Sequence, residues 1–208
     1  MSKKYTKSYS KFTFDDLQQL GLQTQLVNLF DGEIIEPIQA SGWLIEALSR
    51  GSAFSLNTEK AKSEFIIAPI LNELHQNNKS VFAVYSGFNF NVSPEKGLQG
   101  FCDFLLARLP LSIIPQSPII AVVEAKLNQD LLSAVPQCAA EMYATRLWNE
   151  KHNEVLPAIY GTVTTGDSWL FLRLKEGMSI EVDKHSYTLS QLEELLGVWQ
   201  FIIDKFKD

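Results

Sequence analysis

The 208-residue sequence predicts an α/β sandwich, in which helices flank a mixed β-sheet. Two observations support this fold class. Segments with helical periodicity alternate with strand-like segments along the chain, and one helical segment separates two of the strands, as in a crossover connection. The apolar run 119–123, which follows Pro118, is typical of a strand that is buried on both faces.

The first part of the chain is expected to be mainly helical. Residues 1–12 are polar and are expected to be loose. The segments that have helical periodicity or a helix start signal are 13–21, 43–51 and 57–77. Pro69 should bend or split the third of these helices. Between the first two, residues 26–38 show no clear pattern apart from the turn signal Asp31-Gly32.

Strand patterns dominate the second part. Apolar runs or alternation of strand length occur at 81–85, 88–92, 101–108, 118–126, 158–164, 169–172 and 179–182. Helical periodicity returns at 130–148 and from residue 190 onward. The chain is expected to form one domain. Its parts are a loose basic arm (1–12), a helical layer (13–56), a core (57–172) and a C-terminal strand and helix (173–208).

The charge of the chain argues against a general affinity for polyanions. The sequence has 18 basic and 24 acidic residues, a net charge of −6. Four lysines lie in the first dozen residues, which contain no acid, so the remainder has 14 basic and 24 acidic residues, or −10. Contact with nucleic acid is therefore expected only from a local patch or from the arm, and a solvated tail is the more ordinary interpretation of the arm.

No pattern typical of a membrane or secreted protein is found. No apolar run approaches the ~20 residues that a membrane-spanning helix needs, and no apolar segment follows the N-terminal lysines as in a signal peptide. Cys102 and Cys138 are too few for a disulfide framework or a zinc site, and Cys102 lies in an apolar run that predicts a buried thiol. A cytoplasmic location without membrane contact is expected.

Charged side chains interrupt two of the apolar strands. Glu124 and Lys126 end the run 118–126 and should point to the same face, because side chains alternate along a strand. Asp103 lies in the run 101–108, on a face that it should share with apolar neighbours. An unpaired buried charge costs several kcal/mol, so these residues need either a partner or solvent. The ordinary alternative is a strand that runs out into water, with Glu124 and Lys126 exposed.

Pairing of the two strands would bring the two acids together. Asp103 and Glu124 could then lie about one strand spacing apart, roughly 5 Å, and would repel by about 4 kcal/mol at an effective dielectric near 20. One of them must then be protonated at neutral pH, or a cation must lie between them. A hard divalent ion such as Mg²⁺ prefers such oxygen ligands. Lys126 could orient or help to deprotonate a metal-bound water, or stabilise charge on a phosphate.

The order of these residues resembles the motif of the PD-(D/E)xK nuclease superfamily, whose members are restriction-endonuclease-like. Asp103 is followed after twenty residues by Glu124-Ala125-Lys126 at a strand end. Glu64, on the predicted helix before the sheet, and Gln137, on the helix after the motif, are similar to residues that the family often carries there. Cys102 stands where the family motif has proline. The resemblance covers roughly residues 57–172 and is closest to uncharacterised bacterial members.

The resemblance implies a fold and an activity. The fold would be a restriction-endonuclease-like sandwich, with a central mixed sheet of four or more strands, extra N-terminal helices and a C-terminal helix. The activity would be hydrolysis of DNA phosphodiesters that depends on Mg²⁺ (or Mn²⁺), with water as the nucleophile. The metal would be bound by Asp103, Glu124 and the Ala125 carbonyl, with Glu64 in support. Lys126 would position or activate water, and Gln137 would orient Lys126 or a phosphate.

The candidate residues also have ordinary structural interpretations. Asp103 could be a satisfied buried acid, Glu64 a solvent-facing helix acid, and Gln137 an exposed helix residue. Glu141, one turn after Gln137, is expected at the surface rather than in a site. The three histidines are scattered, with no spacing that would predict another metal centre.

Other functions stay open at this point. The acidic chain would suit a nuclease-like fold that acts as a non-catalytic binding or partner module, because a free-standing enzyme on duplex DNA would usually show a stronger basic face. It would also tolerate a hydrolase that acts on something smaller than DNA. A single active centre cuts one strand, so double-strand cleavage would call for a homodimer or a partner protein.

Overall fold

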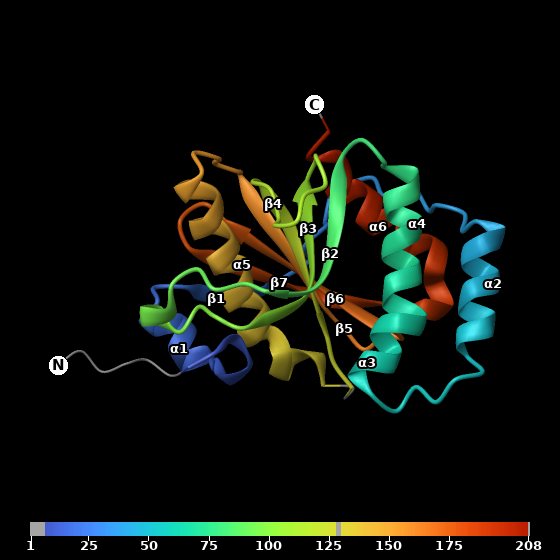
Figure 1. The fold of residues 1–208 in the computed structure, drawn as a ribbon, viewed down its shortest axis with the longest axis horizontal. Coiled ribbons are helices and arrows are strands. Elements are labelled where there is room, and N and C mark those ends of the chain that lie inside the picture. The colour runs from blue at the N-terminus through green and yellow to red at the C-terminus, as the bar shows by residue number, and fades with distance from the viewer. Residues whose placement is uncertain (1–6, 128–129, 208) are drawn as a thin grey trace.

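A seven-stranded mixed sheet runs through the middle of the protein, with helices on both faces (Figure 1). The computed structural model describes residues 7–127 and 130–207. The strand order is β1-β7-β6-β5-β4-β3-β2, and the α/β fold class is confirmed. The strands are β1 Gln23–Val27, β2 Phe82–Asn89, β3 Phe101–Arg108, β4 Ile119–Ala125, β5 Ala158–Thr164, β6 Ser168–Lys175 and β7 Ser179–Thr188.

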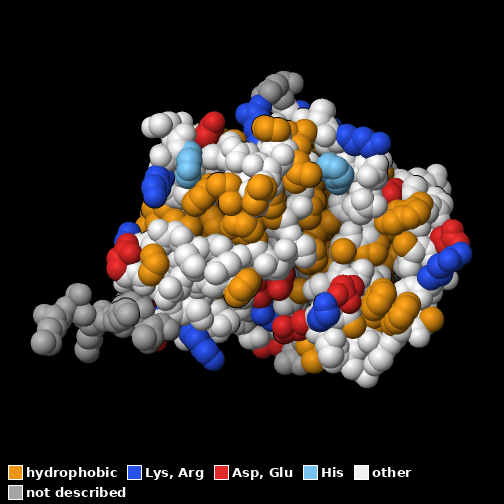
Figure 2. All heavy atoms as spheres, in the orientation of Figure 1, with side chains coloured by type: hydrophobic (Ala, Val, Ile, Leu, Met, Phe, Trp, Pro, Cys, Tyr) orange, Lys and Arg blue, Asp and Glu red, His pale blue; other side chains and the backbone are white. Residues whose placement is uncertain are grey.

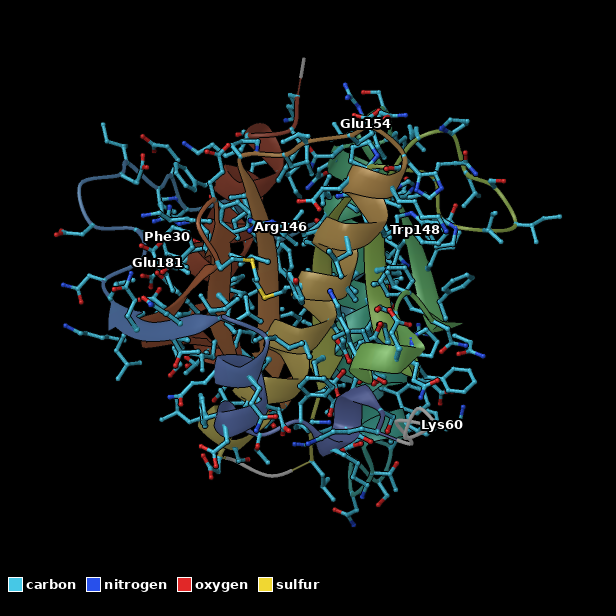
Figure 3. The ribbon with its side chains drawn as sticks, turned by 90° about the vertical axis from the view of Figure 1, so that its left-hand side faces the viewer. Phe30, Lys60, Arg146, Trp148, Glu154 and Glu181 are labelled. Carbon is cyan, nitrogen blue, oxygen red and sulfur yellow. The ribbon has the colours of Figure 1, made fainter. Side chains whose placement is uncertain are left out.

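Six α-helices are defined in the described part of the chain. They are α1 Phe14–Gln19, α2 Gly42–Gly51, α3 Glu59–Lys62, α4 Ala68–Asn77, α5 Val135–Lys151 and α6 Leu192–Asp204. Helix α5 covers one face of the sheet together with α1, whereas α2, α4 and α6 lie on the other (Figure 1). In the view of Figure 3, α5 crosses in front of the strands and carries the labelled Arg146 and Trp148. No helix among the described residues is both long enough and apolar enough to span a membrane.

The sheet is built around β4, whose seven residues are all buried. It pairs antiparallel with β3 and parallel with β5, and α5 makes the crossover between β4 and β5. Helix α5 lies against β5 at Gly161, where any added side chain would collide with Met142 and would meet Cys138 Sγ at 2.9 Å. Cys102 and Cys138 are both buried as free thiols, as predicted for Cys102. The absence of a side chain at Gly161 therefore sets how closely α5 approaches the sheet.

The long helix predicted at 57–77 is interrupted, as expected from Pro69. Helix α3 passes through a π-helical turn, Ser63–Ile67, into α4. Proline has no backbone N–H, so the ordinary bond four residues back is missing at this point. The N–H of Ala68 instead reaches the carbonyl of Ser63, five residues back. The turn changes which side chains of this helix face the sheet.

Strand β2 is one continuous strand, although the sequence predicts two, at 81–85 and 88–92. Gly87, with φ of 61°, lies at the junction and lets the strand bend without a break. Tyr85 before the bend and Phe90 after it both pack in the core on the α5 side of the sheet. In the partner strand β3, Cys102 and Leu105 likewise share this core. The hairpin β2–β3 therefore changes its facing at Gly87, opposite Asp103.

The N-terminal layer is not wholly helical, so this part of the prediction is wrong. Strand β1 lies within it and pairs in parallel with β7 at the sheet edge. Three of its five residues are polar and four are exposed, so no apolar alternation marks it in the sequence. The segment 7–12, expected to be loose, contains a short 3-10 helix in which Tyr9 is buried and donates its hydroxyl proton to the Phe90 carbonyl at 2.8 Å. Residues 1–6 of the predicted arm lie outside the described residues.

Candidate functional site

The candidate site lies at the end of the sheet where β4 ends, α5 begins and α3 stands nearby, in the lower part of Figure 1. Acidic and basic side chains gather on the lower middle of this face in Figure 2, whereas apolar side chains dominate its upper half. The predicted residues Asp103, Glu124, Lys126 and Gln137 meet here. They come from three elements: β3, the end of β4 and the first turn of α5.

Asp103 lies at the position where β3 separates from β4. The ladder between these strands ends at the pair Phe104–Val123, while β4 continues beside β5 to Ala125. One carboxylate oxygen of Asp103 accepts the backbone N–H of Ala125 at 2.8 Å. The side chain therefore supplies the acceptor that a backbone carbonyl of β3 would otherwise give. Strands β3 and β4 therefore do pair, which is the condition that the sequence argument set for bringing Asp103 and Glu124 together.

Glu124 is almost fully buried, with an exposed fraction of 2%. Its Oε1 accepts hydrogen bonds from Lys126 Nζ at 2.5 Å and from Gln137 Nε2 at 2.6 Å. Its Oε2 is buried and has no hydrogen-bond partner among the described residues. Glu124 and Lys126 thus share one face, as the strand alternation predicts, and the alternative of a strand that frays into water is wrong for Glu124.

Helix α5 brings two polar side chains to Glu124. Gln137, in its first turn after Pro136, donates from Nε2 to Glu124 and also lies 3.2 Å from Glu141 Oε1. Glu141 has no exposed surface, so the prediction that it lies at the surface is wrong. The close approach of α5 to the sheet buries this whole turn. The apolar neighbours Ala140 and Met142 on either side are the sequence signal that could have shown it.

Burial raises the pKa values of all three acids of the cluster. Burial, reinforced by the charge of Asp103, raises the pKa of Glu124 to about 8. Burial likewise raises the pKa of Glu141 well above its usual value, with the charge of Glu124 adding to it. Burial raises the pKa of Asp103 too, against the opposing effect of the Ala125 N–H. Of these three acids, Glu124 and Asp103 act on Lys126 through their charge.

Lys126 remains a cation. Burial alone would lower its pKa, but the negative charge of Glu124 and the hydrogen bond to it outweigh burial, and the pKa is raised. A lysine whose pKa is raised stays protonated at neutral pH, so it has no free electron pair with which to accept a proton. The side chain is therefore suited to bind or orient a negative group rather than to accept a proton.

The helix before the sheet supplies an acid other than the predicted one. Glu64 is bound to Lys60 at 2.5 Å in an exposed pair one helical turn apart, on the helix end marked by Lys60 in Figure 3. Glu59, in the first turn of α3, accepts the N–H of Leu127 at 3.3 Å. Its charge acts on both Asp103 and Lys126. Glu59 is thus the acid of this helix that contributes to the electrostatics of the site.

The acidic residues of the cluster are suitable ligands for a hard cation, although their side chains are not arranged around one binding position. Within residues 7–127 and 130–207, no group of three acidic, histidine or cysteine side chains is arranged to hold a metal ion. The buried Oε2 atoms of Glu124 and Glu141 nevertheless lack hydrogen-bond donors. Unpaired carboxylate oxygens in a buried, acid-rich cluster are the chemistry that a divalent cation satisfies.

The sequence matches no protein-family model, and no curated protein is found to match it. The class of site is therefore defined by its own geometry. It is a buried cluster of carboxyl groups with one lysine, at the end of a mixed sheet where two strands part.

Proposed function

We propose that the protein is a metal-dependent nuclease that hydrolyses DNA phosphodiesters. The observation that carries the proposal is the cluster of Asp103, Glu124 and Lys126, in which a buried carboxylate oxygen lacks a donor. Such a set offers hard oxygen ligands beside a fixed positive charge, as metal-assisted phosphoryl chemistry requires.

The order of the core elements supports the restriction-endonuclease-like sandwich that the motif implies. A helix (α3 to α4) precedes three antiparallel strands, β2, β3 and β4, and α5 then leads to β5, which is parallel to β4. Asp103 lies on the second strand of this unit, Glu124 and Lys126 at the end of the third, and Gln137 on the following helix. The positions agree with the motif that the sequence resembles, and the remaining strands extend the sheet on one side.

Asp103 and Glu124 would hold Mg²⁺ or Mn²⁺, with the carbonyl of Ala125 as a further oxygen ligand. When bound, the ion would neutralise the carboxylates and polarise the phosphodiester. Glu64 is a poor candidate for support because it is bound to Lys60 in an exposed pair. Glu59 takes that place in the proposal, through its charge on Asp103 and its contact with the Leu127 N–H.

Lys126 would act on the phosphate as a fixed cation. Its ammonium group would stabilise the negative charge that grows on the phosphate oxygens as a water oxygen bonds to phosphorus and the bond to the leaving oxygen breaks. One proton of that water ends on the leaving oxygen, and the other passes to solvent. Gln137 would hold Glu124 in place through its 2.6 Å hydrogen bond. The role of a general base, open to Lys126 from the sequence alone, does not suit its raised pKa.

A non-catalytic binding or partner module is the second candidate. The net charge of −10 outside the first dozen residues favours it, because a strongly acidic protein repels duplex DNA. Both candidate functions would use the same cluster of residues. They differ in whether the protein cleaves the DNA.

Cleavage assays separate the two. The wild type is incubated with single-stranded, duplex and branched DNA in Mg²⁺ or Mn²⁺, beside Asp103→Asn, Lys126→Met and the control Lys62→Met. Lys62 is a buried lysine paired with Asp167, so the control removes an equivalent charge outside the cluster. The proposal expects cleavage by the wild type and the control and a loss of at least about a hundredfold in the other two. Equal cleavage by all four proteins would reject the site, and no cleavage by any would favour the binding module.

A further inference from the structure

Glu141 is a buried carboxyl group that the proposed mechanism leaves without a role. It lies on α5, one turn after Gln137, and has no exposed surface. Its sequence neighbours Ala140 and Met142 belong to the hydrophobic core on this side of the sheet, and Thr145, one turn further along α5, is a buried neutral residue. A leucine or methionine of similar volume would fill such a position without the cost of removing a carboxyl group from water. A carboxyl group here therefore calls for an explanation other than packing.

The hydrogen bonds connect Glu141 to the site in two ways: through the side chain of Gln137, and directly through the carboxyl group of Glu124. Gln137 Nε2 lies between Glu124 Oε1, at 2.6 Å, and Glu141 Oε1, at 3.2 Å. An amide nitrogen has two hydrogens, so it can donate to both oxygens at once. Glu141 thus holds the amide in the orientation in which its nitrogen, rather than its oxygen, faces Glu124.

That orientation has a consequence for Glu124. With Oε1 occupied by Gln137 and Lys126, the second oxygen, Oε2, is left without a donor. If the amide were reversed, its oxygen would face the carboxylate and would repel it. Residues that orient a metal ligand in this way typically change metal affinity by 10–100-fold when they are removed.

We propose that Glu141 is a positioning residue for a divalent cation site: through Gln137 it fixes the carboxylate of Glu124 with one oxygen free for the cation. The inference rests on the proposed function, since it assumes that Glu124 binds the metal. It assigns to Glu141 the role of a hydrogen-bond acceptor, without contact to the cation.

Calorimetric titration of Mn²⁺ into the metal-free protein tests this role without any measurement of turnover. The variants are Glu141→Leu, which keeps the volume but removes the acceptor, and Glu141→Gln, which keeps an acceptor oxygen. Thr145→Val is the control, because Thr145 is also fully buried and lies one turn further along α5. We expect Glu141→Leu to weaken Mn²⁺ binding at least about tenfold, and Glu141→Gln and Thr145→Val to stay within about threefold of the wild type.

Gln137→Ala provides a second route, since Gln137 is only partly buried and its replacement leaves the core intact. It removes the bridge itself and should weaken Mn²⁺ binding as much as Glu141→Leu, even if the latter folds poorly. Thermal unfolding of each variant shows whether a loss of binding reflects a loss of structure.

The outcomes distinguish this inference from the proposed function. If the wild type binds Mn²⁺ but Glu141→Leu and Gln137→Ala bind it equally well, Glu141 has no positioning role. If Glu141→Gln loses as much affinity as Glu141→Leu, the charge rather than the acceptor matters and the proposed role is wrong. If the wild type does not bind Mn²⁺ at all, the cation site itself is rejected, and Glu141 loses its role with it.

Discussion

The carboxylate of Asp103 accepts the backbone N–H of Ala125 at 2.8 Å, just beyond the last paired residues of β3 and β4. This contact joins the two strands at the point where their ladder has ended. It also fixes Asp103 beside Glu124, because Ala125 follows Glu124 in the chain. This hydrogen bond therefore contributes both to the stability of the fold and to the position of Asp103 in the site. Substitutions of Asp103 can separate the two contributions.

Replacement of Asp103 should separate stability from cation binding. Asp103→Leu leaves the Ala125 N–H without an acceptor and should lower the free energy of unfolding by about 1–3 kcal/mol. Asp103→Asn keeps an acceptor oxygen and should recover most of that loss, while binding of a divalent cation stays impaired because the negative charge is gone. Urea unfolding, with and without Mg²⁺, measures both effects. Equal stability of the Leu and Asn variants would show that the contact with Ala125 contributes little.

The stability of the metal-free protein should fall as the pH rises toward 8. The pKa of Glu124 is about 8 in the folded protein and 4.5 ordinarily, so the folded state holds the proton more tightly than the unfolded chain does. The resulting stabilisation is complete below pH 4.5 and is lost as the pH rises through about 8. Glu141 contributes in the same direction, because its pKa is also raised by burial.

Melting temperatures measured in a chelator from about pH 5.5 to 8.5 test this dependence, because ordinary surface carboxyl groups no longer titrate there. Glu124→Gln should flatten the curve, since glutamine carries no proton to lose. A wild-type melting temperature that stays constant or rises across this range would contradict the buried, protonated state of Glu124.

Gly161→Ala should disturb the packing of α5 on the sheet. The new methyl group would collide with Met142 and lie 2.9 Å from Cys138 Sγ, so the helix must shift. We expect a loss of about 1–3 kcal/mol in the free energy of unfolding. Gly42→Ala is the control, because nothing lies within 4 Å of a side chain added there. If both variants unfold like the wild type, α5 is not held against β5 as closely as the structure indicates.

Much of the fold could be predicted from local patterns. The apolar runs of β3, β4 and β5 are recognisable because most residues of each strand are buried, and most residues of the crossover helix are buried too. Strand β1 is not recognisable, since its mostly exposed residues carry no apolar alternation and are held by pairing with β7 at the sheet edge. In the sequence, Gly87 looks like a break between two strands. The structure shows that β2 continues past it, because β3 pairs with β2 on both sides of Gly87.

The candidate site is predictable where it depends on strand alternation and less so where it depends on helix packing. Strand alternation places Glu124 and Lys126 on one face. The apolar run around Asp103 identifies a strand, and this strand can pair with the strand of Glu124. The helical residues are harder to place. Glu141 is buried because α5 approaches β5 at Gly161. Glu59 of α3, rather than Glu64 of the π-helical turn after it, contacts the end of the site at Leu127. The apolar neighbours of Glu141 hint at its burial, but its contact with Gln137 and Glu124 depends on how closely α5 approaches the sheet.

The two glutamates of the helix before the sheet should therefore differ in their effect on cation binding. Glu59→Gln removes a negative charge that acts on Asp103 and Lys126, and it should weaken Mg²⁺ binding by roughly two- to tenfold. Glu64→Gln removes only an exposed pair with Lys60 and should leave Mg²⁺ binding unchanged. Calorimetric titration compares the two, and a larger effect from Glu64 would restore it as the acid that supports the site.

The central claim is that Asp103 and Glu124 form a site for a divalent cation, and the melting temperature in Mg²⁺ tests it most directly. The wild type, Glu124→Gln and the control Glu64→Gln are compared at about pH 9, above the pKa of Glu124. Mg²⁺ at a hundredfold excess over its dissociation constant should stabilise the wild type by about 2.7 kcal/mol, or roughly 5–10 °C for a protein of this size. The wild type and Glu64→Gln should show this rise, and Glu124→Gln should lose it. The same shift in all three proteins, or no shift in the wild type, would contradict it.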